Sequence, residues 1–311
     1  MRASCTSRRC SSDSGSRRSS PSTWAPIAVT PVTPAICAQV DGLDLRDPLS
    51  DEQRHDVHDA LMRHLVLFFR DQDLTEDQQL AFASNFGPPV SASINKDDDP
   101  DALLFVTLED SADSPPQSDR WHTDVAFVPE PPDIAVLNMR ETPAVGGDTM
   151  WLSLYAAYEA LSPTMQELVT DLRLDLDLGT TKDAILRMSG PEYLAEVLAQ
   201  FENVRHPLVR VHPVTNRKAL YMCGSYMRGI VGMHPDESEA LLSLLQARLN
   251  DPNIQCRWRW QQYDVAMWDE RCTNHRGLSD HYPAHRLIRR CLVGEGAPLG
   301  PGDSERLGAP A

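Results

Sequence analysis

The chain has 311 residues, 41% of them hydrophobic, and a formal net charge of −16 at pH 7. This is enough apolar material for a sizeable core, and no run of about 18 apolar residues is present to span a membrane. Because so acidic a chain lacks the basic surface that phosphate backbones require, we expect no nucleic-acid partner.

The N-terminal segment differs in composition from the rest of the chain. Residues 1–24 are rich in serine and arginine and lack the apolar stretch of a secretory signal, so we predict a disordered leader there. A single domain is expected over residues 25–300, with a flexible tail over 301–311. The cysteines form no CxxC pair and are odd in number, which predicts reduced thiols in a cytoplasmic protein; they are Cys5, Cys10, Cys37, Cys223, Cys256, Cys272 and Cys291.

Two capping boxes organise the first third of the chain. Ser50 to Gln53 opens a helix expected to reach about residue 64, and Thr75 to Gln78 opens a second helix that ends before a C-cap at Gly87. The apolar run at 65–69 between them predicts a buried strand. Polar loops are then expected on either side of a strand at 103–108, followed by strands at 122–128 and 133–140.

The remainder alternates short elements. A Gly146-Gly147 turn precedes helical stretches at 154–173, broken at Pro163, and at 181–200. A further helix starts at Pro235, and short strands are expected at 207–211, 219–223, 255–260, 265–268 and 285–293. This pattern predicts a mainly β fold with flanking helices (α+β), arranged as a sandwich or jelly roll.

A histidine and a carboxylate stand two residues apart at His122 and Asp124. On the expected strand both side chains would project to one side and could hold one metal ion. With a second histidine they would form the 2-His-1-carboxylate triad that binds Fe(II). The chain has another such pair at His234 and Asp236, but Pro235 and the acids after it indicate a helix start, so we interpret that pair as a cap.

His275 is the candidate third ligand, because it follows the expected strand at 265–268. Four other histidines compete with it and are more typical of surface or structural positions: His206, His212, His281 and His285.

On the last strand, alternation puts Arg286 and Arg290 on one face. Their Cα atoms would lie roughly 13 Å apart, which suits two different anions better than one. We interpret Arg289 as a solvated charge.

Together these motifs resemble the taurine dioxygenase (TauD/TfdA) family from about Ile27 to Gly296. The matching residues are Trp121-His122-Thr123-Asp124, Gly146-Gly147-Asp148-Thr149, Trp268-Asp269-x-Arg271-x-Thr273-x-His275, Arg286 and Arg290. Members are Fe(II)- and 2-oxoglutarate-dependent dioxygenases with a double-stranded β-helix, a jelly roll. The resemblance therefore implies O2 and 2-oxoglutarate as cosubstrates, succinate and CO2 as coproducts, and a homo-oligomer such as a dimer or tetramer.

Carried over residue by residue, the resemblance makes His122, Asp124 and His275 the iron ligands. It implies that Thr149 and Arg286 bind the distal carboxylate of 2-oxoglutarate, and that Arg290 faces the substrate anion. Related halogenases lack the carboxylate ligand, so the presence of Asp124 argues against halogenation.

The substrate pocket departs from the taurine-specific members. Those carry a histidine and a tyrosine after the Phe-Gly that is Phe86-Gly87 here, where residues 88–95 read PPVSASIN, and an amide at the position of Ser118. These differences argue against taurine and favour an alkyl sulfate, an alkyl sulfonate or an aryloxyalkanoate. Tyr226 is a candidate pocket wall, with ordinary core packing equally compatible.

Two other functions remain open from the residues alone. His/Asp/His can hold Zn²⁺ in a hydrolase, but a zinc hydrolase gives no role to Thr149 and Arg286. A non-catalytic jelly-roll protein could bind anions without a redox metal. Neither accounts for the whole set of residues.

Overall fold

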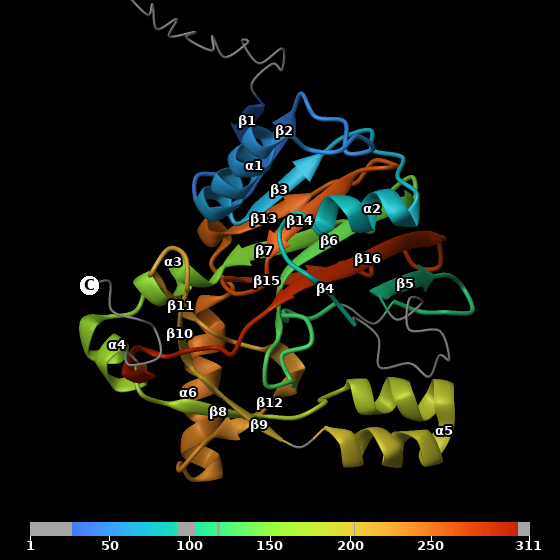
Figure 1. Ribbon diagram of the computed structural model, residues 1–311. Coiled ribbons are helices and arrows are strands. Elements are labelled where there is room, and N and C mark those ends of the chain that lie inside the picture. Colours follow the sequence, from blue (N-terminus) through green and yellow to red (C-terminus); the bar gives the residue numbers. More distant parts are fainter. Residues whose placement is uncertain (1–26, 92–103, 117–118, 202, 304–311) are drawn as a thin grey trace, which may run out of the picture.

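A computed structural model describes residues 27–91, 104–116, 119–201 and 203–303 (Figure 1). Its largest sheet carries most of the strands from both ends of the chain. In order across the sheet they are β1 (Ala28–Pro31), β2 (Ala38–Asp41), β3 (Val66–Phe69), β14 (Val265–Asp269), β6 (Pro132–Glu141), β16 (Arg286–Glu295) and β4 (Pro89–Val90), with β5 (Phe105–Asp110) also paired to β16. Only the β2–β3 pair among these is parallel.

A second sheet of three strands lies against the large one. Its order is β13 (Gln255–Trp258), β7 (Thr149–Ser153) and β15 (Thr273–Gly277). Aromatic rings fill the space between the two sheets, since Phe68 of β3 stacks on Trp258 at 3.8 Å between centroids. Two sheets packed in this way, with helices outside them, agree with the predicted jelly roll of α+β character.

The remaining elements form the lower half of Figure 1. The helices there are α3 (Leu154–Glu159), α4 (Pro163–Val169), α5 (Thr181–Gln200) and α6 (Pro235–Arg248), with short turns η2 (Gly224–Tyr226), η3 (Pro252–Ile254) and η4 (Pro301–Asp303). Two small sheets join them, β12 (Met227–Ile230)-β8 (Arg173–Leu176)-β9 (Val204–Pro207) and β10 (Val209–Val211)-β11 (Lys218–Leu220). The predicted helix at 181–200 is interrupted at Gly190, whose φ is 83°.

Both predicted capping boxes are confirmed. They start α1 (Asp51–His64) and α2 (Glu76–Ala83), and in each the N-cap side chain and the glutamine three residues later exchange hydrogen bonds. The cap assigned to the second His-x-Asp pair is also confirmed, because His234 is the N-cap of α6 and its N–H donates to Glu237. Local side-chain chemistry thus sets these helix starts.

Gly87 does not cap α2, contrary to the prediction, because that helix ends at Ala83 with Ser84 as its C-cap. A Cβ atom at Gly87 would instead lie 2.7 Å from the backbone nitrogen of Gly294, so the glycine permits a close approach of two chain segments.

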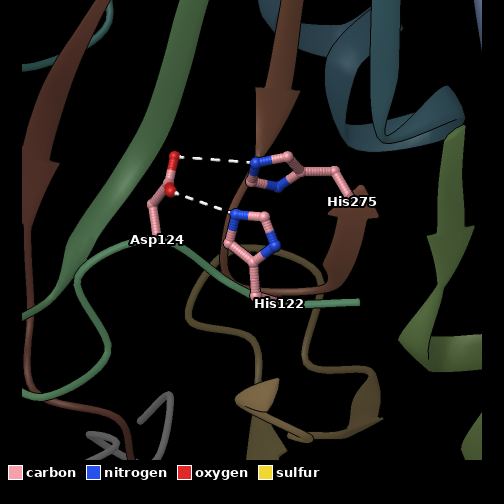
Figure 2. A group of neighbouring side chains, drawn as sticks. All are labelled: His122, Asp124 and His275. Atoms are coloured by element: carbon pink, nitrogen blue, oxygen red, sulfur yellow. Dashed lines mark ion pairs between the residues drawn. The ribbon is translucent and has the colours of Figure 1, made fainter. Parts of the chain in front are cut away.

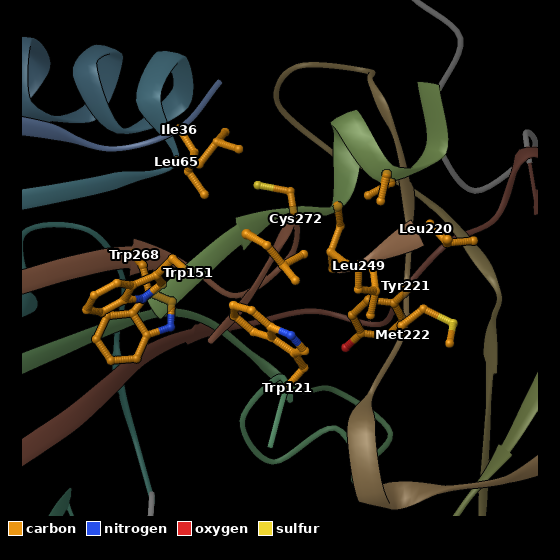
Figure 3. Packing of buried hydrophobic residues seen from close by; sticks show 14 of the residues in the cluster. Ile36, Leu65, Trp121, Trp151, Leu220, Tyr221, Met222, Leu249, Trp268 and Cys272 are labelled. Atoms are coloured by element: carbon orange, nitrogen blue, oxygen red, sulfur yellow. The ribbon is translucent and has the colours of Figure 1, made fainter. Parts of the chain in front are cut away.

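The core connects the sheets to the segments that carry the candidate site. Figure 3 shows Trp151 and Trp268 packed together, with Trp121 nearby; the Trp151 and Trp268 centroids are 5.7 Å apart. All three indoles belong to one buried cluster. Because Trp121 directly precedes His122, this packing holds the start of the metal-binding segment in place.

Other expectations concern the whole chain. The five cysteines within the described ranges are buried and unpaired, as predicted. None of the described helices is long and apolar enough to cross a membrane. The predicted leader lies outside the described residues, as does the tail beyond Asp303, whose carboxylate pairs with Arg173 at 2.7 Å.

Candidate metal and cosubstrate site

The two candidate histidines come together through backbone pairing. His122 forms an isolated β-bridge with His275 of β15, in which each N–H donates to the other carbonyl at 3.0 and 2.9 Å. The predicted strand at 122–128 is wrong, because the chain turns directly after this bridge and Val125 has a φ of 51°. His275 was expected just after a strand but lies within β15.

The three predicted ligands face one another (Figure 2). His122 Nε2 lies 3.7 Å from Asp124 Oδ1, and His275 Nε2 lies 3.8 Å from Asp124 Oδ2. His122 Nδ1 lies 2.7 Å from the Arg120 carbonyl; donating there leaves Nε2 free to ligate. The cluster therefore has the reach and the donor atoms to hold one ion.

The buried polar atoms also fit a cation. Asp124 is 4% exposed, and its Oδ2 accepts no hydrogen bond from the described residues. Burial alone would raise the pKa of Asp124, but the charge of Arg290 and then the two imidazoles lower it to about 2. For His275, burial followed by the neighbouring His122 lowers the pKa well below its usual range. An ionised carboxylate and neutral imidazoles are the states that metal ligands require.

Thr149 and Arg286 also meet, on the side of β7 next to β15. Thr149 pairs with Gly277 in the register of these strands, two residues beyond His275. Its hydroxyl oxygen accepts from Arg286 Nη2 at 3.3 Å and from Trp260 Nε1 at 3.0 Å. Because both contacts use the oxygen as acceptor, the Thr149 O–H remains available to donate to an anion.

Arg286 has a further partner that the sequence did not indicate. Its Nη1 donates to Asp110 Oδ2 at 3.2 Å, and His281 Nε2 lies 3.3 Å from the same oxygen. The buried Nε of Arg286 has no hydrogen-bond partner among the described residues. The guanidinium is thus held in position while one donor stays free.

Arg290 points to the metal cluster, and Arg289 to the opposite side of β16. Arg290 Nη1 lies 2.5 Å from Asp124 Oδ2. Arg289 was interpreted as a solvated charge, and this is wrong: it is 9% exposed and donates to Gln79 at 2.9 Å and to the Leu74 carbonyl at 2.8 Å. Helix α2 and the loop before it cover this face of the sheet, which strand alternation alone cannot reveal.

Residues 28–292 match the Taurine catabolism dioxygenase TauD, TfdA family. The chain belongs to this family. An alkylsulfatase from Acinetobacter baylyi is 34% identical to it, over 85% of this chain and 84% of the relative. An alpha-ketoglutarate-dependent sulfate ester dioxygenase from Pseudomonas putida is 32% identical, over 88% and 91%. A crystal structure of a taurine dioxygenase from Burkholderia xenovorans superposes with a TM-score of 0.76 at 31% identity, covering 89% of this chain and 94% of that one.

Membership of the TauD/TfdA family confirms the predicted jelly roll and the predicted class, a 2-oxoglutarate-dependent dioxygenase. The alternatives of a zinc hydrolase and a non-catalytic binding protein are set aside. The roles of the individual residues stay predictions.

Two candidate substrate contacts of this TauD/TfdA chain have different outcomes. Tyr226 lies in η2 with its ring centroid 5.3 Å from that of Phe127. Burial, with the nearby Asp124 charge, raises the pKa of Tyr226 to about 12, so the phenol is neutral. Ser118 lies outside the described residues.

The competing histidines take structural positions, as expected. His206 lies 2.9 Å from the Val128 carbonyl, and His212 lies 3.0 Å from Asp269. His285 stands at the surface between two glutamates. Asp110 and Trp260 are the site residues that sequence reasoning missed, since each is recognisable only through the partner it contacts.

Proposed function

We propose that His122, Asp124 and His275 hold Fe(II), and that the enzyme uses 2-oxoglutarate and O2 to hydroxylate a small organic anion, releasing succinate and CO2. The observation that carries this proposal is the His/Asp/His cluster. It combines the 2-His-1-carboxylate donor set with a carboxylate oxygen that lacks a hydrogen bond.

The residues around the cluster supply the second half of the proposal. When bound, the ferrous ion activates O2 at the positions that its three protein ligands leave open. Arg286 and the Thr149 hydroxyl hold the distal carboxylate of 2-oxoglutarate, because both present free donors from buried positions. The fixed guanidinium orients the cosubstrate toward the metal, while burial keeps water away.

Arg290 is the proposed contact for the substrate anion. Its guanidinium lies beside Asp124, and its buried Nε has no partner among the described residues. The segment after Asp124 packs into an apolar cluster that includes Phe127 and borders Tyr226. An anion-binding guanidinium next to apolar side chains suits a substrate with a charged head and a hydrocarbon body.

We therefore place an alkyl sulfate first among the substrate classes, followed by alkyl sulfonates and aryloxyalkanoates. The relatives named as an alkylsulfatase and a sulfate ester dioxygenase support this order. Taurine ranks lower because its ammonium group gains nothing from an apolar wall.

The test is O2 uptake and succinate formation by anaerobically iron-loaded protein with 2-oxoglutarate. Alkyl sulfates, alkyl sulfonates, aryloxyalkanoates and taurine are compared, with an Asp124→Asn variant as the metal-site control. We expect an alkyl sulfate to stimulate succinate formation in the wild type but not in the variant. Absence of stimulation by every compound, or equal rates in the Asp124→Asn variant, would refute the proposal.

A further inference from the structure

A fully buried carboxylate, Glu270, lies directly behind the metal cluster, between β14 and β15. Its exposed fraction is 0%. Oε1 accepts from the Trp268 indole at 2.6 Å, and Oε2 accepts from the backbone N–H of Asp124 at 3.1 Å. The same carboxylate therefore contacts the backbone of one proposed metal ligand and an indole whose centroid lies 4.8 Å from the ring of another, His275.

His275 has one ring nitrogen that still lacks a partner. Nε2 faces Asp124, whereas the buried Nδ1 makes no hydrogen bond within the described residues. A neutral imidazole that gives the Nε2 lone pair to a metal carries its proton on Nδ1, and a buried N–H requires an acceptor. Glu270 Oε1 lies 4.0 Å from this nitrogen, so a small movement of the ring completes the contact.

The two histidines thus differ in what stands behind them. His122 has the neutral carbonyl of Arg120 at its Nδ1, and His275 has a carboxylate. A carboxylate behind a ligating histidine fixes its tautomer and raises its basicity more than a carbonyl does.

Glu270 also affects the charge balance. The Arg290 guanidinium lies 2.5 Å from Asp124, and its positive charge opposes a divalent cation nearby. The Glu270 carboxylate offsets this charge from within the same buried region.

We propose that Glu270 is a positioning residue of the metal site, which holds Asp124 by its backbone, fixes the tautomer of His275 and thereby increases metal affinity. This inference rests on the proposed metal ligands. Nothing in the expected ligand set required an acidic residue at this position.

The test is titration of metal-free protein with Co²⁺, following the visible absorption of the bound ion. Glu270→Gln keeps the size of the side chain, but only one end of its amide can accept a hydrogen bond. We expect the dissociation constant for Co²⁺ to rise about tenfold to a hundredfold, the usual effect of losing such a partner. We also expect the absorption spectrum of the bound ion to change.

Asp264 provides a matched control elsewhere in the fold. It is also fully buried, and its Oδ2 accepts from the Trp258 indole at 3.1 Å and from a backbone N–H at 2.9 Å. Asp264→Asn should lower the melting temperature and leave both the Co²⁺ affinity and the spectrum unchanged. This separates a metal-site role from general loss of a buried carboxylate.

The outcomes separate the inference from the proposed function. If His122→Ala binds Co²⁺ as tightly as the wild type, the proposed metal site is wrong. If His122→Ala loses binding but Glu270→Gln has wild-type affinity and spectrum, only the role of Glu270 is overturned. Should Glu270→Gln not fold, Glu270→Asp keeps the charge but withdraws the carboxylate by one carbon–carbon bond; it should also weaken Co²⁺ binding, and unchanged affinity would overturn the inference.

Discussion

Replacing Arg286 with lysine tests the cosubstrate site most directly. The guanidinium spans two partners, donating to Thr149 at 3.3 Å and to Asp110 at 3.2 Å. Lysine keeps the positive charge beside Asp110 but cannot reproduce the planar fork. A hydrogen bond to a charged group contributes about 1.5–3 kcal/mol. The loss of one such bond to 2-oxoglutarate should therefore raise its KM about 10- to 150-fold.

The assay is the initial rate of succinate formation against 2-oxoglutarate concentration at saturating substrate. Arg289→Lys is the matched control, because Arg289 is buried on the opposite face of the same strand, against Gln79. It should lower the melting temperature without changing the KM for 2-oxoglutarate. A KM within about twofold of wild type in Arg286→Lys, or an equal rise in Arg289→Lys, would refute this reasoning.

Three further outcomes follow from the same geometry. Arg290→Ala should raise the KM of the organic anion about tenfold or more and leave that of 2-oxoglutarate nearly unchanged in the succinate assay; equal effects on both would contradict the assignment of the two arginines. Thr149→Val leaves the Trp260 indole N–H without its acceptor, so urea unfolding should show about 1–3 kcal/mol less stability, whereas Thr149→Ser should retain it. Burial lowers the pKa of His206 from 6.5 to about 4, although its bond to the Val128 carbonyl opposes this. Stability from His206 is thus complete above about pH 6.5 and falls by about 3 kcal/mol as pH drops through 4; His206→Gln should flatten this part of a urea-unfolding pH series, and an unchanged slope would exclude His206 as its source.

The features predicted correctly from sequence depend on neighbours along the chain. The capping boxes at Ser50 and Thr75 need only residues three apart, so the local sequence specifies the starts of α1 and α2. Alternation along β16 likewise places Arg286 and Arg290 on the face opposite Arg289 whatever packs against the strand.

The wrong predictions concern segments whose conformation depends on distant contacts. The residues after His122 form a turn although they are apolar and β-prone, because the pairing with His275 stops after one bridge. Arg289 is buried because α2 covers its side of the sheet, and Gln79 of that helix accepts its hydrogen bond. No periodicity within either segment carries this information.

The sequence by itself determined which residues form the metal cluster and the class of enzyme, because those motifs keep a characteristic order and spacing along the chain. Only the tertiary structure decided what stands behind those residues: Asp110 behind Arg286, Trp260 behind Thr149, and Glu270 behind His275. The physical reason is that a hydrogen bond between strands depends on register and on the distance between two sheets. Those quantities are set by the packing of the whole core.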